Sequence, residues 1–409
     1  MYENAAAIAA FLLVYTAFSG RVERSWLSGP VVFTAGGLIL GQGGLGLLHL
    51  NMGAEEVRIL AEGTLAMVLY TDAASADFRV VRQNVALPGR LLLIGLPLTI
   101  VAGFLIARWL FPGLDPLEAA LLATILAPTD AALGKPVVTD RTLSAPIREG
   151  LNLESGLNDG ICVPVVVILL DLAVGTEIHG DTVAHALRVV VEELGIGLVV
   201  GLAATGCASL LLRATVKRGW VSEDWVEVPV VALAVVCFAA AQAIGGSGFI
   251  ACFVGGLMVS WLAPRRKHDL LRGAESIGSA LAMLTWVAFG ALIVGFLMRM
   301  TWPAILYALL SLTVIRMVPV FLSLLGTGLA AAEKLFIGWF GPRGLATVVF
   351  GVIVVNAHLP GNDVVAQVAV CTVLISIVAH GVSANPLLKA LRSRLGTPQE
   401  RAAGETAPS

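Results

Sequence analysis

The feature that most constrains this sequence is a series of apolar runs, each close to the length that crosses a bilayer. The run "LLLIGLPLTIVAGFLIARWLF" holds a single charged residue, and ~20 apolar helical residues span the ~30 Å hydrocarbon layer. Of the 409 residues, 57% are hydrophobic and only 13% are charged, with a mean hydropathy of +0.89. This composition excludes an ordinary soluble domain. It predicts an all-α polytopic membrane protein.

Charged and Gly/Pro-rich joints divide the chain into about thirteen expected transmembrane helices, with ends uncertain by a few residues. The expected spans are roughly 5–19, 29–48, 57–74, 88–110, 117–138, 150–174, 183–213, 226–245, 248–263, 273–298, 302–325, 333–356 and 364–388. Residues 1–392 are predicted to form this transmembrane domain. The polar, small-residue sequence of 393–409 predicts a short disordered cytoplasmic tail.

Basic residues predict the orientation of these helices. Lys and Arg gather at alternate joints, whereas the joints "HLNMGAEE", "FPGLDP" and "GTEIHGD" contain neither. By the positive-inside rule the N-terminus lies outside and the C-terminus lies in the cytoplasm, as an odd number of spans requires. The start of the chain lacks a basic n-region, so we expect a retained first helix in a multi-pass protein of the cell inner (plasma) membrane.

Two of the expected spans are interrupted in the middle. The fifth contains "ILAPTDAALGKP" and the twelfth contains "IGWFGPRGLATVVFG". Discontinuous helices at matching positions of two halves are typical of secondary transporters with inverted repeats. Each interruption also carries a charge, Asp130 in the first and Arg343 in the second. The pattern predicts two inverted six-helix repeats with a site where the broken helices meet.

The sixth span begins with "LNLESGLNDG", which places several polar residues in an otherwise apolar helix. At 100° per residue, Glu154, Ser155, Asn158 and Asp159 fall within an arc of about 140° and can face one cavity. In the fifth span, Thr129 and Asp130 follow Pro128, which has no N–H and so frees a carbonyl upstream. Carboxylate, hydroxyl, amide and carbonyl oxygens predict a site for a small cation, and the carboxylates also accept protons.

The motifs "APTDAALG", "ESGLNDG" and "GPRGLA" resemble those of the NhaP-type sodium/proton antiporters of the monovalent cation:proton antiporter superfamily. The resemblance covers essentially residues 5–390. It implies the sodium/proton antiporter fold, a homodimer and alternating access. One departure is Ala131, where many relatives carry a proline after Thr-Asp.

The resemblance also implies roles for single residues. Asp159 would carry the cation or the proton. Four residues would complete the site for the transported Na⁺, namely Asp130, Thr129, Ser155 and Glu154. Arg343 would form an ion pair with Glu154, and Asn158 would be structural.

Simpler explanations stay open for several polar residues. Glu154 and Arg343 could serve only to hold helices together, and Arg316 is an alternative partner for Glu154 or an interhelical anchor. Asp72 lies near a span end, where its side chain could reach water. His380 could tune a pH response or satisfy the end of a helix.

The predicted function is electroneutral exchange of a monovalent cation, most simply Na⁺, for H⁺, contributing to pH homeostasis. Asn158 stands where electrogenic relatives carry a second aspartate, so the sequence predicts one cation per proton. The alternatives are a K⁺/H⁺ (or Li⁺) antiporter, an ion-binding membrane sensor without net transport, and an intramembrane aspartyl hydrolase. No enzyme activity, cofactor or nucleic-acid partner is expected, and the five cysteines occur singly, without metal-site spacing.

Overall fold

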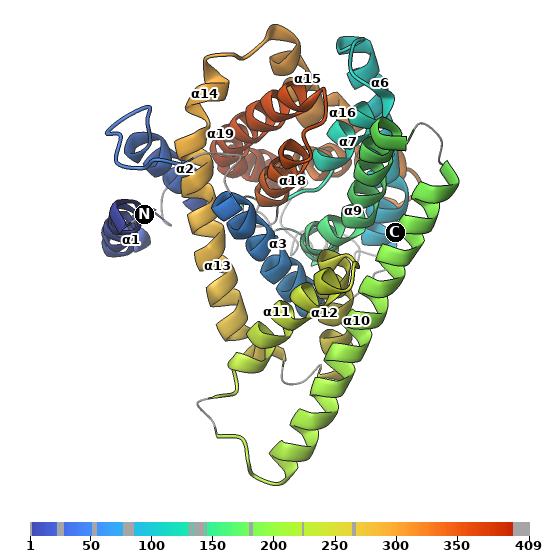
Figure 1. Cartoon of the computed structure of the whole chain (residues 1–409). Coiled ribbons are helices and arrows are strands. Elements are labelled where there is room, and N and C mark those ends of the chain that lie inside the picture. The colour runs from blue at the N-terminus through green and yellow to red at the C-terminus, as the bar shows by residue number, and fades with distance from the viewer. Residues whose placement is uncertain are drawn as a thin grey trace, which may run out of the picture.

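The computed structural model describes residues 2–22, 28–50, 55–76, 86–130, 133, 143, 145–179, 183–222, 225–263 and 267–395. Within these ranges the chain is helical apart from short connections (Figure 1). The first half contains α1 (Tyr2–Val22), α2 (Gly29–Leu40), α3 (Glu55–Ser75), α5 (Ala86–Arg90), the π-helical turn η1 (Leu91–Gly95), α6 (Leu96–Leu110), α7 (Pro116–Ile125) and α9 (Ala145–His179). The second half contains α10 (Val183–Lys217), α11 (Val228–Ala243), α12 (Gly248–Leu262), α13 (Lys267–Leu292), α14 (Val294–Leu297), α15 (Trp302–Leu312), α16 (Val314–Ser323), α17 (Ala331–Trp339), α18 (Leu345–Asn356) and α19 (Asn362–Leu395).

The all-helical membrane architecture is confirmed. In the described part of the chain, 7 segments are long and apolar enough to cross a membrane, and five shorter apolar helices of 10–17 residues accompany them. The total of thirteen spans and the inverted repeat remain predictions. The expected tail lies mostly outside the described residues, because α19 continues to Leu395 and residues 396–409 are not described.

The helices form two bundles that meet along a seam. The scaffold bundle consists of α2, α3, α10, α11, α12 and α13, and the core bundle consists of α6, α7, α9, α15, α16, α17, α18 and α19. Within each bundle the helices pack extensively. Between the bundles, α9 lies against α3, α10 and α12, and α18 lies against α3 and α13. Figure 1 shows this arrangement of the helices. Helices α9 and α18 therefore form the core side of the seam between the two bundles.

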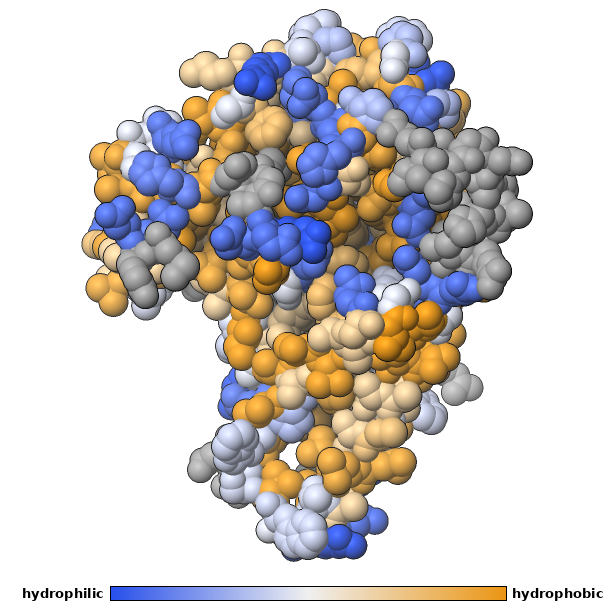
Figure 2. Space-filling view, viewed as in Figure 1, coloured by the Kyte–Doolittle hydropathy of each residue, from blue (hydrophilic) through white to orange (hydrophobic). Residues whose placement is uncertain are grey.

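The outer surface of the scaffold bundle is apolar. Figure 2 shows hydrophobic residues over the lower half of the molecule, where α10, α11 and α12 lie in Figure 1. Leu198, Leu202, Leu210 and Val235 are among the exposed side chains on α10 and α11. An apolar surface of this kind is costly in water and is what a helix presents to lipid.

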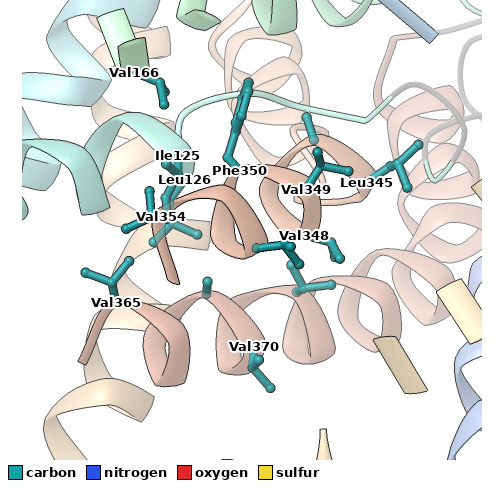
Figure 3. Close-up of a cluster of buried hydrophobic side chains, with 14 of the residues drawn as sticks. Ile125, Leu126, Val166, Leu345, Val348, Val349, Phe350, Val354, Val365 and Val370 are labelled. Carbon is teal, nitrogen blue, oxygen red and sulfur yellow. The ribbon is translucent and has the colours of Figure 1, made fainter. Parts of the chain in front are cut away.

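In contrast, α18 is enclosed by protein. Val348, Val349, Phe350 and Val354 are buried on different sides of this helix, between α19 and the C-terminal end of α7 (Figure 3). A helix that is apolar all round is expected to be buried on every side. Because the N-terminal end of α18 at Leu345 is buried, the backbone N–H groups of its first turn need partners inside the protein.

Candidate functional site

The site begins where two helices stop inside the core bundle. Helix α7 ends at Ile125 and α17 ends at Trp339, and residues 126–130 and 340–344 continue without helical structure. Each segment contains a proline, which has no N–H to extend a helix and disfavours helical geometry in the residue before it. The two segments are joined by a hydrogen bond from the Asp130 N–H to the Pro342 carbonyl, 2.8 Å long. The two predicted interruptions therefore meet.

Oppositely charged side chains satisfy the two helix ends at this junction. The Arg343 guanidinium donates to the carbonyls of Ala127 (2.7 Å) and Pro128 (3.1 Å), beyond the C-terminal end of α7. The Asp130 carboxylate accepts from the Leu345 N–H (2.9 Å) at the N-terminus of α18. These signs match the partial charges of helix ends, negative at the C-terminus and positive at the N-terminus.

Helix α19 also contributes hydrogen bonds to this junction. The Arg343 N–H donates to the Ser376 hydroxyl (2.7 Å), and the His380 Nε2 lies 2.9 Å from the Trp339 carbonyl at the end of α17. His380 and Ser376 are both buried. Of the two roles considered for His380, the structure places it at a helix end. Ser376 was not singled out from the sequence, since a lone serine in an apolar helix gives no signal.

The polar face of α9 reaches this junction as the sequence predicts. The Asn158 amide donates to the Thr129 hydroxyl (2.7 Å), and the hydroxyls of Thr129 and Ser155 lie 3.0 Å apart. Asp159 is only 8% exposed. Its Oδ1 atom is buried and accepts no hydrogen bond from the described residues. The Thr-Asp and Asn-Asp motifs thus form one cluster with a carboxylate oxygen that is free to bind a ligand.

The expected ion pair between Glu154 and Arg343 is wrong. Glu154 instead pairs with Arg316 of α16, whose Nη2 lies 2.6 Å from Oε1 and 2.8 Å from Oε2, and both side chains are almost completely buried. The Arg343 Nη1 instead donates to the Ala127 and Pro128 carbonyls beyond α7. Arg316 was the alternative partner that the sequence left open.

A cavity of about 220 Å³ lies next to Asp159 in the seam between the bundles. Such a volume has room for several water molecules. The core bundle contributes Thr129, Asp130, Ser155, Asp159 and Leu345 to its wall, and the scaffold bundle contributes Val68, Thr71, Asp72, Glu275, Gly278, Ser279, Ala282 and Trp286. Since Glu275 is exposed, the cavity reaches the surface at the end where α3 stops and α13 begins.

The cavity divides the predicted site residues into two groups. Asp159, Asp130, Thr129 and Ser155 line it, whereas Glu154, Asn158 and Arg343 do not. Within the described part of the chain, acidic and other ligating side chains do not converge in a closed metal centre. The oxygen atoms on the wall are hard ligands, which suit a partly hydrated alkali cation.

The sequence interpretation missed the residues that the scaffold bundle contributes to the cavity wall. Glu275 was not considered, and Asp72 was explained by its closeness to a span end. A signal was present, because Glu275 and Ser279 are four residues apart and therefore share one face of a helix that is otherwise apolar in its later turns. Which helix they would face could not be inferred without the tertiary structure.

Comparison with known families and proteins adds sequence relatives. The model of the family described as "Sodium/hydrogen exchanger, transmembrane" matches residues 8–390. The K(+)/H(+) antiporter NhaP2 of Shewanella sp. (strain ANA-3) is 26% identical over 357 residues, which cover 86% of this chain and 61% of the relative. The K(+)/H(+) antiporter NhaP of Alkalimonas amylolytica is 26% identical over 97% of this chain and 67% of its own length. The Na(+)/H(+) antiporter of Schizosaccharomyces pombe is 24% identical over 71% of this chain and 68% of its own length. The chain therefore matches about three fifths of the length of the Shewanella relative.

A similar fold occurs among solved structures. The structure of the sodium proton antiporter MjNhaP1 from Methanocaldococcus jannaschii at pH 8 has a TM-score of 0.74 and 22% identity, covering 94% of this chain and 98% of that chain. A second structure of the same antiporter, from an electron-microscopy map, has a TM-score of 0.75 and 19% identity over the full length of both chains. At these identities the likeness establishes the fold.

Proposed function

We propose that this chain, which belongs to the transmembrane sodium/hydrogen exchanger family and is of the NhaP type, exchanges a monovalent cation for protons across a membrane. The observation that carries the proposal is Asp159. It is a buried carboxylate with an oxygen that no described residue binds, and it lines a cavity between two separately packed bundles. An ionisable residue in this setting inside a membrane protein is expected to bind transported ions or protons.

In the proposed cycle, a cation and a proton compete for Asp159. Binding of either one neutralises the carboxylate, so the core bundle can move along the scaffold bundle without carrying an unpaired charge through the seam. Ser155 and Thr129 supply hydroxyl oxygens next to Asp159, and Asp130 adds a second carboxylate while capping α18. Asn158 is proposed to position Thr129 through its hydrogen bond of 2.7 Å.

We propose Na⁺ as the exchanged cation, with K⁺ as the second candidate. The family description and the name of the Schizosaccharomyces relative support sodium. The names of the Shewanella and Alkalimonas relatives support potassium. Hard oxygen ligands accept both ions, and the choice between them depends on cavity size and on the number of coordinating oxygens.

Three further points belong to the proposal. Exchange is electroneutral, because position 158 holds an amide and Asp159 is the one carboxylate of its motif. The protein works as a homodimer in the cell inner (plasma) membrane and supports pH homeostasis. The N-terminus is outside and the C-terminus is cytoplasmic, which puts Arg213 and Lys217 near the cytoplasmic end of α10, in accord with the positive-inside rule.

Proteoliposomes with an imposed Na⁺, K⁺ or Li⁺ gradient and a trapped pH dye test this function. We expect an outward cation gradient to acidify the lumen, with Na⁺ more effective than K⁺ at equal concentration. Vesicles containing the Asp159→Asn protein serve as the control. If none of the three cations moves protons in vesicles with folded wild-type protein, the antiporter proposal is wrong. If only K⁺ does, the ion assignment changes and the antiporter function stands.

A further inference from the structure

Helix α19 carries a polar stripe that the proposed mechanism has not used. The stripe consists of Ser376, His380 and Ser383, and steps of four and three residues place them on one face of a helix. Ser376 and His380 are both buried. The stripe faces the end of α17, because the Trp339 Nε1–H donates to the Ser383 hydroxyl (2.9 Å) and the rings of Trp339 and His380 have centroids 5.2 Å apart.

The His380 ring and the Ser376 hydroxyl together connect the two sides of the break between α17 and α18. On the α17 side, the His380 Nε2 atom lies 2.9 Å from the Trp339 carbonyl. The His380 Nδ1 atom lies 3.2 Å from the Ser376 hydroxyl and 2.9 Å from the Ser376 carbonyl. A neutral ring that donates from Nε2 to the Trp339 carbonyl keeps Nδ1 as an acceptor for the Ser376 hydroxyl proton. On the α18 side, the Ser376 oxygen accepts from the Arg343 N–H (2.7 Å).

One peptide unit carries this connection onward to the cavity. The Arg343 N–H and the Pro342 carbonyl belong to the same peptide, and the carbonyl accepts from the Asp130 N–H (2.8 Å). Asp130 lines the cavity beside Asp159. Because a peptide unit is planar, its N–H and its carbonyl turn together. The hydrogen bond to Ser376 therefore fixes the direction in which the same plane presents its carbonyl to Asp130.

We propose that Ser376 and His380 are positioning residues of the cation site, which act on Asp130 through the Pro342–Arg343 peptide. This inference rests on the proposed exchange function and deepens it. Neither residue occurs among the described residues that line the cavity, so the effect on the cation is indirect. Without the Ser376 hydroxyl, a buried N–H loses its partner and the peptide plane is free to turn. The Asp130 carboxylate then stands at a less favourable distance from the cation.

A purely structural role would have a different kinetic signature. A hydrogen bond that only stabilises the core bundle changes the amount of folded protein, and hence the saturating rate of exchange. It leaves the half-saturating cation concentration of the folded molecules unchanged. A positioning role changes that concentration, because the distance from a carboxylate to the cation sets their attraction.

The experiment measures the half-saturating cation concentration and the saturating rate of proton exchange in proteoliposomes, with Na⁺, or with K⁺ if wild type exchanges only K⁺. Ser376→Ala should raise the half-saturating concentration by about tenfold, the scale of one hydrogen bond to a buried group, and change the saturating rate by less than about twofold. Ser376→Thr keeps a hydroxyl and should stay close to wild type. The matched control is Ser383→Ala, which removes a hydrogen bond of the same stripe that does not involve Arg343.

A double-mutant cycle tests whether His380 acts through Ser376. His380→Leu keeps a similar side-chain volume and should raise the half-saturating concentration by about threefold, because the Ser376 hydroxyl stays but loses one partner. The double variant with Ser376→Ala should be no worse than Ser376→Ala alone, since both residues act on one peptide. Additive losses would overturn this shared path.

The remaining outcomes separate the positioning role from the exchange function. An unchanged half-saturating concentration in Ser376→Ala, or an equal rise in Ser383→Ala, overturns the positioning role. A folded Ser376→Thr protein that behaves like Ser376→Ala does so too, because the hydroxyl would then not matter. If Ser376→Ala does not fold, His380→Leu decides by the same measurement, and an unchanged concentration there refutes the proposal. Absence of exchange in wild-type vesicles would instead refute the antiporter function itself.

Discussion

Two buried polar regions lie a short distance apart on α9, and they are built in opposite ways. Around Glu154 the charges have opposite signs and bind each other or helix ends, as in the Glu154–Arg316 pair and the contacts of Arg343 with two carbonyls. Around Asp159 the neighbouring charges are acidic and share a cavity. We call the first region the closed cluster and the second the open cavity.

Under the proposed function, one helix serves both structure and transport. A charge inside a bilayer is tolerated when it is paired within the protein or when it faces water. The closed cluster uses fixed partners within the core bundle, since Glu154 pairs with Arg316 and the Arg343 guanidinium binds two backbone carbonyls. In the open cavity the Asp159 Oδ1 atom has no partner among the described residues, and the proposed function assigns its charge to an exchangeable cation or proton.

The largest effect is expected from Asp159→Asn, which removes the carboxylate from the open cavity but keeps its shape. Exchange should fall to the background of protein-free liposomes, while the melting temperature in detergent stays close to that of wild type. The matched control is Asp171→Asn on the same helix, which should exchange normally. Retained flux through a folded Asp159→Asn protein would show that the open cavity does not hold the exchanged charge.

In the closed cluster, the variant Glu154→Gln should affect stability rather than transport chemistry. It leaves Arg316 as an uncompensated buried charge, with a loss on the order of 3 to 5 kcal/mol. Thermal unfolding in detergent should show a clear drop that the exposed control Glu56→Gln does not. The double variant Glu154→Gln with Arg316→Gln should recover part of the loss, because no charge is then stranded. An unchanged melting temperature for the single variant would show that the Glu154–Arg316 pair does not stabilise the fold.

A smaller effect is expected at Gly344, where the two regions join. A Cβ at this position would stand 1.9 Å from the Asp130 Oδ2 atom that accepts from the Leu345 N–H. Gly344→Ala should therefore displace Asp130 from the end of α18, at a cost of about 1 to 3 kcal/mol, and should weaken exchange. Gly156→Ala is the control, since nothing lies within 4 Å of its added Cβ. Equal stability of the two variants would mean that Asp130 is not needed as a cap.

A pH series tests whether protons and cations compete for Asp159 in the open cavity. As pH falls, protons occupy Asp159 more often and the apparent affinity for the cation weakens, by up to about tenfold per pH unit when one proton competes at one site. Initial exchange rates at several cation concentrations and pH values give this dependence. The exposed control Glu56→Gln should show the same pH dependence as wild type. A cation affinity that ignores pH would refute competition at a shared carboxylate.

The smallest effect is expected from membrane voltage. If one cation exchanges for one proton, no net charge crosses the membrane in a cycle. A valinomycin-set potential without an ion gradient should then drive no proton movement beyond the leak of protein-free vesicles. Proton movement that depends on both voltage and the transported cation would refute electroneutral exchange.

The sequence determined that the chain spans a membrane as a set of helices, because no other arrangement hides the backbone of such long apolar runs from lipid. It also located the two breaks, since proline and glycine act locally on the backbone. The grouping of Ser155, Asn158 and Asp159 could also be predicted, because the pitch of one helix places them on one face. Thr129 joins them from the first break.

Partners across the bundle were decided by the tertiary structure. The sequence offered Arg343 and Arg316 as partners of Glu154. In the fold Glu154 pairs with Arg316, and Arg343 donates to carbonyls beyond α7. The face of α3 that carries Asp72 could have pointed to lipid, to water or to the seam. Packing against α12 and α13 directs it into the cavity beside Asp159. Helix periodicity fixes which residues share a face, whereas only packing decides what that face meets.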